Sequence, residues 1–211
     1  MTDKTIIRPQ LFPLILSDPP WEYKDRCNAG KRGAAHKYDV MKLEDIKLLP
    51  VDKVAAPDSE LWLWGTWPLL KEALAIMEAW GFEYKTLGFD WMKVSKAGRP
   101  LIRGGSGTRS NTEFCIRGVR GAGLQRVDAG VPSAILTVPS KRHSRKPQEA
   151  RERLVRLYGD IPRLELFATD PLEGWVQLGD KIDGRDIRDS LPELIPPTPS
   201  GSQISIWDFA A

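Results

Sequence analysis

Residues 11–21 read LFPLILSDPPW, an apolar run that ends in an acid, two prolines and an aromatic residue. An unbroken run of branched apolar residues predicts a strand that is buried on both faces, as in a parallel sheet. The two prolines end that strand, because they donate no backbone N–H and have a fixed φ. In open α/β sheets, ligands bind beyond the carboxyl ends of the strands. The sequence therefore predicts a ligand site at Asp18, Pro19, Pro20 and Trp21.

These four residues suit the activation of an exocyclic amine on a nucleobase. The amine of adenine or cytosine is a poor nucleophile, because its lone pair is delocalised into the ring. A carboxylate and a proline carbonyl that accept its two hydrogens favour tetrahedral geometry at nitrogen, and an aromatic ring stacks on the extruded base. Asp18, the carbonyl of Pro19 or Pro20, and Trp21 offer these groups. The alternative is a strand followed by an ordinary type I turn.

Length and composition predict one folded domain followed by a tail. The chain has 211 residues, of which 41% are hydrophobic, and this is enough for one sizeable core over residues 1–189. Residues 190–211 begin with a proline-rich stretch and are expected to form a flexible tail. No run is long enough for a membrane span and the N-terminus has no signal-peptide pattern, so we expect a cytoplasmic protein.

The cysteines and histidines predict no metal site. Cys27 and Cys115 do not have C-x-x-C spacing, and His36 and His143 are the only histidines. These four residues do not form a recognisable ligand set for zinc, so we expect reduced thiols and no bound metal.

The positive charge is concentrated in the middle of the chain. Between Lys93 and Arg156 there are fifteen Lys and Arg against four Asp and Glu, although the whole chain has a net charge of only +3. A glycine-rich loop within this segment suits binding to a phosphate backbone. We assign that contact to Arg103, Arg109, Lys141 and Arg142. The alternative is a solvated loop with ordinary surface charges.

Apolar patterning predicts that strands and helices alternate along the chain. Such alternation is typical of an α/β fold with a mostly parallel sheet and helices on both faces. The expected strands cover residues 11–17, 61–65, 82–93, 113–118, 134–138, 163–168 and 175–179, and the expected helices cover 42–49, 69–80 and 147–158.

Six motifs occur in an order that resembles one family. They are DPPW at 18–21, LWLW at 61–64, EFCIRGVRG at 113–121, HSRKP at 143–147, ELFA at 165–168, and the segment from Gly174-Trp175 to Asp183-Gly184. This order resembles the eukaryotic mRNA adenosine-N6 methyltransferases and their bacterial and phage relatives, over about residues 12–187. The resemblance implies a single-domain Rossmann-like S-adenosylmethionine methyltransferase, circularly permuted so that the catalytic motif precedes the cofactor strand.

The resemblance also implies roles for individual residues. It assigns cofactor binding to Asp18, Lys146, Glu165, Thr169, Asp180 and Lys181. It assigns the base pocket to Tyr38, Trp64 and Trp91. Lys146 is expected to keep Asp18 ionised. Relatives usually have Arg at the position of Thr169 and an Asn-Gln or Asn-Glu pair at Asp180-Lys181, so the hydrogen bonds to ribose are expected to differ. The plainer interpretation makes Trp64 and Trp91 core aromatics, as we expect for Trp62 and Trp80.

Function and partners are inferred from the same resemblance. We expect methyl transfer to the N6 amine of adenine in DNA, in a bacterial cell or a phage-infected host. There are two alternatives. One is an adenosine-N6 methyltransferase that acts on RNA, and the other is a non-catalytic nucleic-acid-binding subunit with the same fold. The tail segment Gln203-Ile204-Ser205-Ile206-Trp207 resembles the pentapeptide by which bacterial DNA enzymes bind the sliding clamp. A monomer and a homodimer are both compatible with the sequence.

Overall fold

A seven-stranded sheet forms the centre of the computed structural model, which describes residues 9–22, 40–102, 107–109, 111–138 and 145–197. The strand order is β5-β3-β4-β2-β1-β6-β7. The strands are β1 (Phe12–Ser17), β2 (Ala55–Gly65), β3 (Glu83–Lys93), β4 (Thr112–Arg120), β5 (Ala134–Thr137), β6 (Arg163–Leu166) and β7 (Val176–Leu178). Strand β4 runs antiparallel to both of its neighbours, and all other pairs are parallel. The prediction of a mostly parallel α/β sheet is confirmed.

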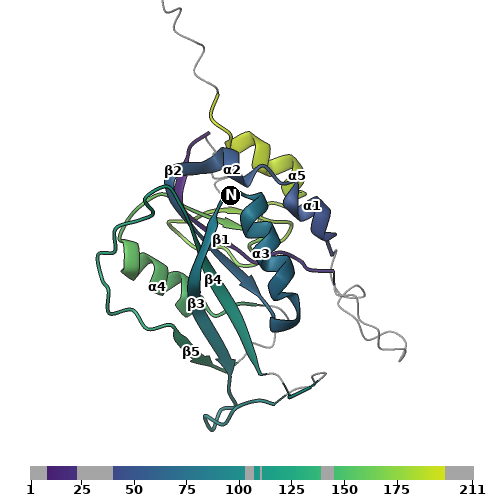
Figure 1. Cartoon of the computed structure of the whole chain (residues 1–211), viewed down its shortest axis with the longest axis vertical. Coiled ribbons are helices and arrows are strands. Elements are labelled where there is room, and N and C mark those ends of the chain that lie inside the picture. Colours follow the sequence, from purple (N-terminus) through teal and green to yellow (C-terminus); the bar gives the residue numbers. More distant parts are fainter. Residues whose placement is uncertain (1–8, 23–39, 103–106, 110, 139–144, 198–211) are drawn as a thin grey trace, which may run out of the picture.

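Helices cover both faces of this sheet (Figure 1). They are α1 (Leu43–Lys47), α2 (Val51–Val54), α3 (Leu70–Ala79), α4 (Gln148–Tyr158) and α5 (Ile187–Ser190), with 3-10 turns at Trp67–Leu69 and Leu191–Leu194. Side chains of a strand alternate between the two faces. In β2, Leu61 and Leu63 therefore join the core under α3, whereas Trp62 and Trp64 join the core under α4. Among the described residues, no helix is long and apolar enough to cross a membrane.

Strand β2 starts six residues earlier than expected from the apolar pattern. Its first half contains the polar residues Ser59 and Glu60, both fully buried. Burial of such groups is tolerated because each has a partner. Ser59 donates a hydrogen bond to the carbonyl of Ala56 at 2.8 Å, and Glu60 accepts one from Arg117 Nε at 2.6 Å. The pattern of apolar residues alone does not reveal such a strand.

The folded part of the chain continues past the boundary that we drew after Asp189. Ser190, Leu191 and Leu194 are fully buried, and both leucines belong to the core under α3. The backbone N–H of Gln10 also donates to the carbonyl of Leu194 at 3.1 Å, beside the start of β1. The expected tail therefore begins too early, because residues 190–194 contribute apolar side chains to the core.

Glu60, in the middle of β2 and opposite Leu14 of β1, forms a buried polar network. Its carboxylate accepts hydrogen bonds from Arg117 on β4, from the Tyr158 hydroxyl at the end of α4, and from the Leu124 backbone N–H at 3.1 Å. The bond from Arg117 raises the pKa of that guanidinium. This network attaches α4 and the 121–133 segment to the sheet.

Replacement of Glu60 by Gln should destabilise the fold. The variant leaves Arg117 without its counter-charge in a largely desolvated site, so the free energy of unfolding should fall by about 2–4 kcal/mol. Urea denaturation measures this loss. The control is Glu83→Gln, because Glu83 is exposed and pairs with Lys85 at 2.6 Å on the surface. This control should lower the free energy of unfolding by less than about 1 kcal/mol. Equal effects of the two substitutions would contradict this role of Glu60.

Candidate functional site

A cleft opens at the carboxyl ends of β1, β2 and β6. Strand register brings these ends together, because Ser17 pairs with Leu63 of β2 on one side and with Leu166 of β6 on the other. The empty space, including the part that is open to solvent, is about 300 Å³. Its lining residues are Leu16, Asp18, Trp64, Lys146, Arg151, Glu165, Phe167 and Thr169.

Backbone hydrogen bonds hold the turn that follows β1. The Asp18 N–H donates to the carbonyl of Leu166, at the end of β6, over 3.5 Å. The Pro19 carbonyl accepts from the Trp21 N–H at 2.9 Å, and the Pro20 carbonyl accepts from the Met41 N–H at 2.8 Å. Each carbonyl oxygen has a second lone pair and can accept one more hydrogen bond. The turn therefore fixes Asp18 at the mouth of the cleft.

Asp18 begins a chain of alternating charges, of which Asp18 and Lys146 line the cleft. Lys146 Nζ lies 2.7 Å from each carboxylate oxygen of Asp18. The same ammonium lies 3.3 Å from Glu113 Oε2, and Glu113 in turn pairs with Lys93. All four side chains are only partly exposed, with 21% for Asp18 and 16% for Lys146. In such a site, charge pairing is screened less than on the surface.

The pKa values of these groups follow from burial and pairing. Burial raises the pKa of Asp18 above its ordinary value, and the charge of Lys146 only partly opposes this rise. Burial lowers the pKa of Lys146, but Asp18 and Glu113 outweigh it, so the net shift is upward and the ammonium stays protonated. Burial raises the pKa of Glu113, but Lys146 and Lys93 reverse it and the net shift is downward. Lys146 thus favours the ionised form of Asp18, but burial has the larger effect and the net pKa of Asp18 is raised.

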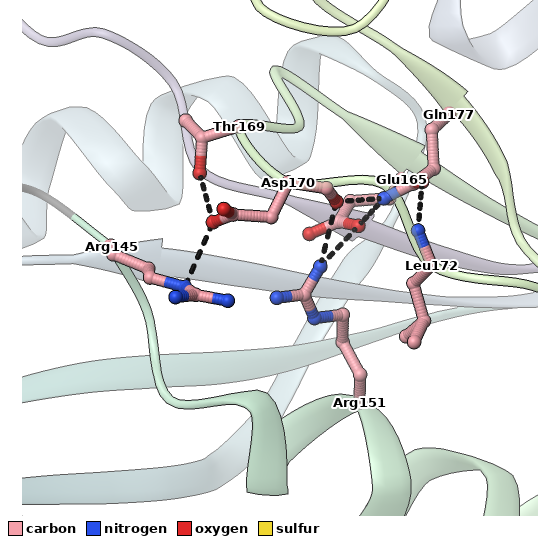
Figure 2. Close-up of polar contacts among 7 residues, drawn as sticks. All are labelled: Arg145, Arg151, Glu165, Thr169, Asp170, Leu172 and Gln177. Atoms are coloured by element: carbon pink, nitrogen blue, oxygen red, sulfur yellow. Dashed lines mark hydrogen bonds and ion pairs between the residues drawn. The ribbon is translucent and has the colours of Figure 1, made fainter. Parts of the chain in front are cut away.

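A second carboxylate, Glu165 of β6, lies in the cleft within its own set of partners (Figure 2). Arg151 Nη1, from α4, donates to Glu165 Oε2 at 3.2 Å, and Gln177 Nε2, from β7, donates to the same oxygen at 2.5 Å. Arg151 and Gln177 also donate to the carbonyl of Asp170, at 3.3 and 2.9 Å. Burial raises the pKa of Glu165, and Arg151 and Gln177 oppose the rise.

The loop that follows β6 has a constrained backbone beside the cleft. Phe167 has φ of 61°, in the left-handed region that non-glycine residues rarely adopt. Close packing against Gly179 after β7 supports this loop, because a Cβ at Gly179 would lie 2.6 Å from the carbonyl oxygen of Ala168. The Ala168 N–H also donates to Leu178 at 2.9 Å. Such strained residues cluster at functional sites.

The tryptophans differ in where their rings lie. Trp64 is almost fully buried and also lines the cleft, with Lys146 Nζ 5.8 Å from its ring centroid. Trp91 is buried edge-to-face against Trp64 at 6.2 Å and does not line the described cleft. Trp62 and Trp80 are core residues, as predicted. Trp21 packs into the core under α3, so stacking of Trp21 on a base stays a prediction.

Apart from Thr169, the remaining predicted site residues fall outside the cleft or outside the described residues. Thr169 lines the cleft, whereas Asp180 and Lys181 pair with each other on the surface. Arg109 is exposed. The assignments for Tyr38, Arg103, Lys141, Arg142 and the segment Gln203-Ile204-Ser205-Ile206-Trp207 concern residues that the structure does not describe. Cys115 is buried, and burial raises the pKa of its thiol. The described residues contain no cluster of His, Cys, Asp and Glu that could hold a metal ion.

Four charged or polar side chains of the site were missed by the sequence analysis. Lys93, Glu113, Arg151 and Gln177 come from β3, β4, α4 and β7, and each contacts one of the predicted residues or its partner. Glu113 opens the EFCIRGVRG motif, which was a usable signal. Arg151 follows Lys146 by five residues at the start of an amphipathic helix, where a surface arginine is the ordinary expectation.

A mostly parallel α/β sheet with a carboxylate-lined cleft at its strand ends defines a methyltransferase-like fold. The family model MT-A70 matches residues 12–181, and this chain belongs to that family. The chain is 28% identical to the type II methyltransferase M.MunI of a Mycoplasma species, over 83% of this chain and 80% of that protein. It is 29% identical to the N6-methyladenosine RNA methyltransferase MTA1 of Cryphonectria parasitica, over 85% of this chain and 54% of that protein. It is 30% identical to the non-catalytic subunit MTB of an Arabidopsis thaliana N6-adenosine-methyltransferase, over 57% of this chain and 16% of that protein.

Removal of the Lys146 charge should raise the pKa of Asp18 further. In Lys146→Met the carboxylate keeps its burial and loses its nearest cation, so its ionised form becomes less favourable. The side-chain carboxyl ¹³C shift of Asp18, followed against pH, reports this pKa directly. Lys146→Arg retains the charge and should stay near the wild-type value. A lower pKa of Asp18 in Lys146→Met would contradict the assigned ion pair.

Proposed function

We propose that this chain transfers a methyl group from S-adenosylmethionine to the N6 amine of adenine in DNA. One observation carries the proposal: the carboxylate of Asp18 lies at a rigid turn beyond a buried strand, inside a cleft, and is paired with a lysine. Membership in the MT-A70 family supports methyl transfer, and relatives named for N6-adenine methylation support the target amine.

The donor groups of the cleft fit S-adenosylmethionine. The cofactor has a carboxylate, an amino group and a ribose diol, and the cleft contains the ammonium of Lys146 and the carboxylates of Asp18 and Glu165. Leu16, Trp64 and Phe167 add apolar surface. In the proposal, Lys146 binds the cofactor carboxylate, and Glu165 accepts hydrogen bonds from the polar groups of the cofactor. When bound, the cofactor supplies an electrophilic methyl group on a sulfonium.

Asp18 and one proline carbonyl then orient the adenine amine. Each oxygen of the Asp18 carboxylate retains a lone pair beyond its contact with Lys146, and one of the two oxygens accepts one N–H of the amine. The carbonyl of Pro19 or Pro20 accepts the other N–H. With both hydrogens held, the nitrogen lone pair points toward the methyl group, and the proton that the amine loses leaves through Asp18. Positioning and electrostatics supply the rate, because no covalent enzyme intermediate is needed.

DNA is the favoured polymer. The similarity to a type II methyltransferase extends over 83% of this chain and 80% of that protein. The basic segment from Lys93 to Arg156 supplies charge for a phosphate backbone. RNA is the second candidate, because the fungal RNA methyltransferase is similarly close in sequence. A non-catalytic role is less favoured, since a scaffold subunit does not need an acid that reaches a cleft.

Product analysis tests this proposal. The protein is incubated with methyl-labelled S-adenosylmethionine and, separately, duplex DNA, single-stranded DNA and RNA, and each polymer is digested to nucleosides. The expected labelled product is N6-methyldeoxyadenosine from a DNA pool. Label only in N6-methyladenosine from the RNA pool would mean that RNA, not DNA, is the substrate. Label in a cytosine derivative would overturn the assignment of adenine as the target base.

The isosteric variant Asp18→Asn should lose at least about 10³-fold in the single-turnover methylation rate, because the amide offers a weaker acceptor and no proton acceptor. S-adenosylmethionine affinity should change much less. Calorimetric binding separates the two effects, and Asp183→Asn on the surface is the control substitution. Methylation by Asp18→Asn at the control rate would remove Asp18 from the mechanism.

Replacement of Arg103 and Arg109 together by Ala should weaken binding to all DNA sequences alike. If each arginine neutralises one phosphate, the slope of log affinity against log salt should fall by about 2. Fluorescence anisotropy over a salt series measures both quantities. A changed sequence preference with an unchanged slope would show instead that these arginines contact bases.

A further inference from the structure

Arg151 is a buried cation that the proposed chemistry does not yet use. It lies in the first half of α4, and its side chain is only 7% exposed. Burial of an unpaired guanidinium would be costly, so its partners determine its role. The described partners are the carboxylate of Glu165 at 3.2 Å and the carbonyl of Asp170 at 3.3 Å. Arg151 therefore joins the cofactor-facing strand β6 to the loop that follows it.

Glu165 is a carboxylate that needs such a partner. It lies opposite Leu16 in the register of β1 and β6, close to the end of the strand that leads to Asp18, and the negative charge of Asp18 raises its pKa further. Gln177 donates one hydrogen bond to it but brings no charge. Among these groups, Arg151 supplies the positive charge that favours an ionised Glu165 with a fixed orientation.

We infer that Arg151 is a positioning residue: it holds Glu165 ionised and oriented in the cleft so that Glu165 accepts hydrogen bonds from the bound cofactor. This inference rests on the proposed function, because it takes S-adenosylmethionine as the ligand. Arg151 acts through Glu165 and through the loop at Asp170, and it makes no direct contribution to methyl transfer. Figure 2 shows Arg151 of α4 bonded both to Glu165 of β6 and to the loop that follows it.

A double-mutant cycle on cofactor affinity tests this role. S-adenosylmethionine and S-adenosylhomocysteine are titrated calorimetrically into the wild type, Arg151→Met, Glu165→Gln and the double variant. Arg151→Met should weaken both ligands by at least about tenfold, the usual effect of losing a charged hydrogen bond. In the Glu165→Gln background the same substitution should cost about threefold or less, because its target is already gone.

The pH dependence gives a readout that a purely structural role would not move. The groups that face Glu165 are Arg151 from α4, Gln177 from β7 and Asp18 from the end of β1. Without Arg151 the pKa of Glu165 should rise, so the affinity of Arg151→Met should fall more steeply toward acidic pH than that of the wild type. Arg151→Lys keeps a charge and should recover the wild-type pH profile, with part of the affinity.

The control is Arg153→Met on the same helix. Arg153 pairs with Glu149 at 2.6 Å and donates to the carbonyls of Pro132 and Ala134, away from the cleft. Its loss should lower stability and leave cofactor affinity unchanged. Additive effects of Arg151→Met and Glu165→Gln, or wild-type affinity of folded Arg151→Met, would overturn the inference while leaving the proposed function intact. Absence of cofactor binding by the wild type would overturn both.

Discussion

Two carboxylates at the ends of adjacent parallel strands are each paired with a cation, and both cations lie in or just before α4. Asp18 follows β1 and Glu165 lies in β6, and both face the same cleft. Lys146, just before α4, neutralises the first, and Arg151, within α4, neutralises the second. Without these cations, two partly buried negative charges would repel each other or take up protons. The arrangement of the cleft therefore follows from where α4 packs.

The position of α4 is fixed at both of its ends. Near its start, Arg151 bonds to Glu165, and at its end Tyr158 donates to the buried Glu60. Between them, Leu154 and Leu157 pack on the tryptophan-rich face of the sheet. A change at Glu60 thus bears on the cleft through α4, because Glu60 and Glu165 bond to opposite ends of that helix. Stability and ligand binding are coupled through this one helix.

The local features were predictable from the sequence, whereas most ion pairs were not. The run before Asp18 marks a buried strand because its side chains are apolar without interruption. Lys146 could be assigned only by family resemblance, since it lies 128 residues from Asp18 along the chain. Arg151 has no local pattern that separates it from a surface charge, and the roles of Arg151 and Glu113 depend on strand order. The buried Glu60 was missed for the same reason, because its partners Arg117 and Tyr158 are distant in the sequence.

The central claim is that the Asp18 carboxylate holds the N6 amine of adenine opposite the methyl donor. A crystal structure with S-adenosylhomocysteine and an adenine-containing oligonucleotide tests this most directly. The account predicts an extruded adenine whose N6 lies about 3 Å from an Asp18 oxygen, with the cofactor sulfur on the other side of the nitrogen. An adenine bound elsewhere, with Asp18 contacting only Lys146, would contradict it.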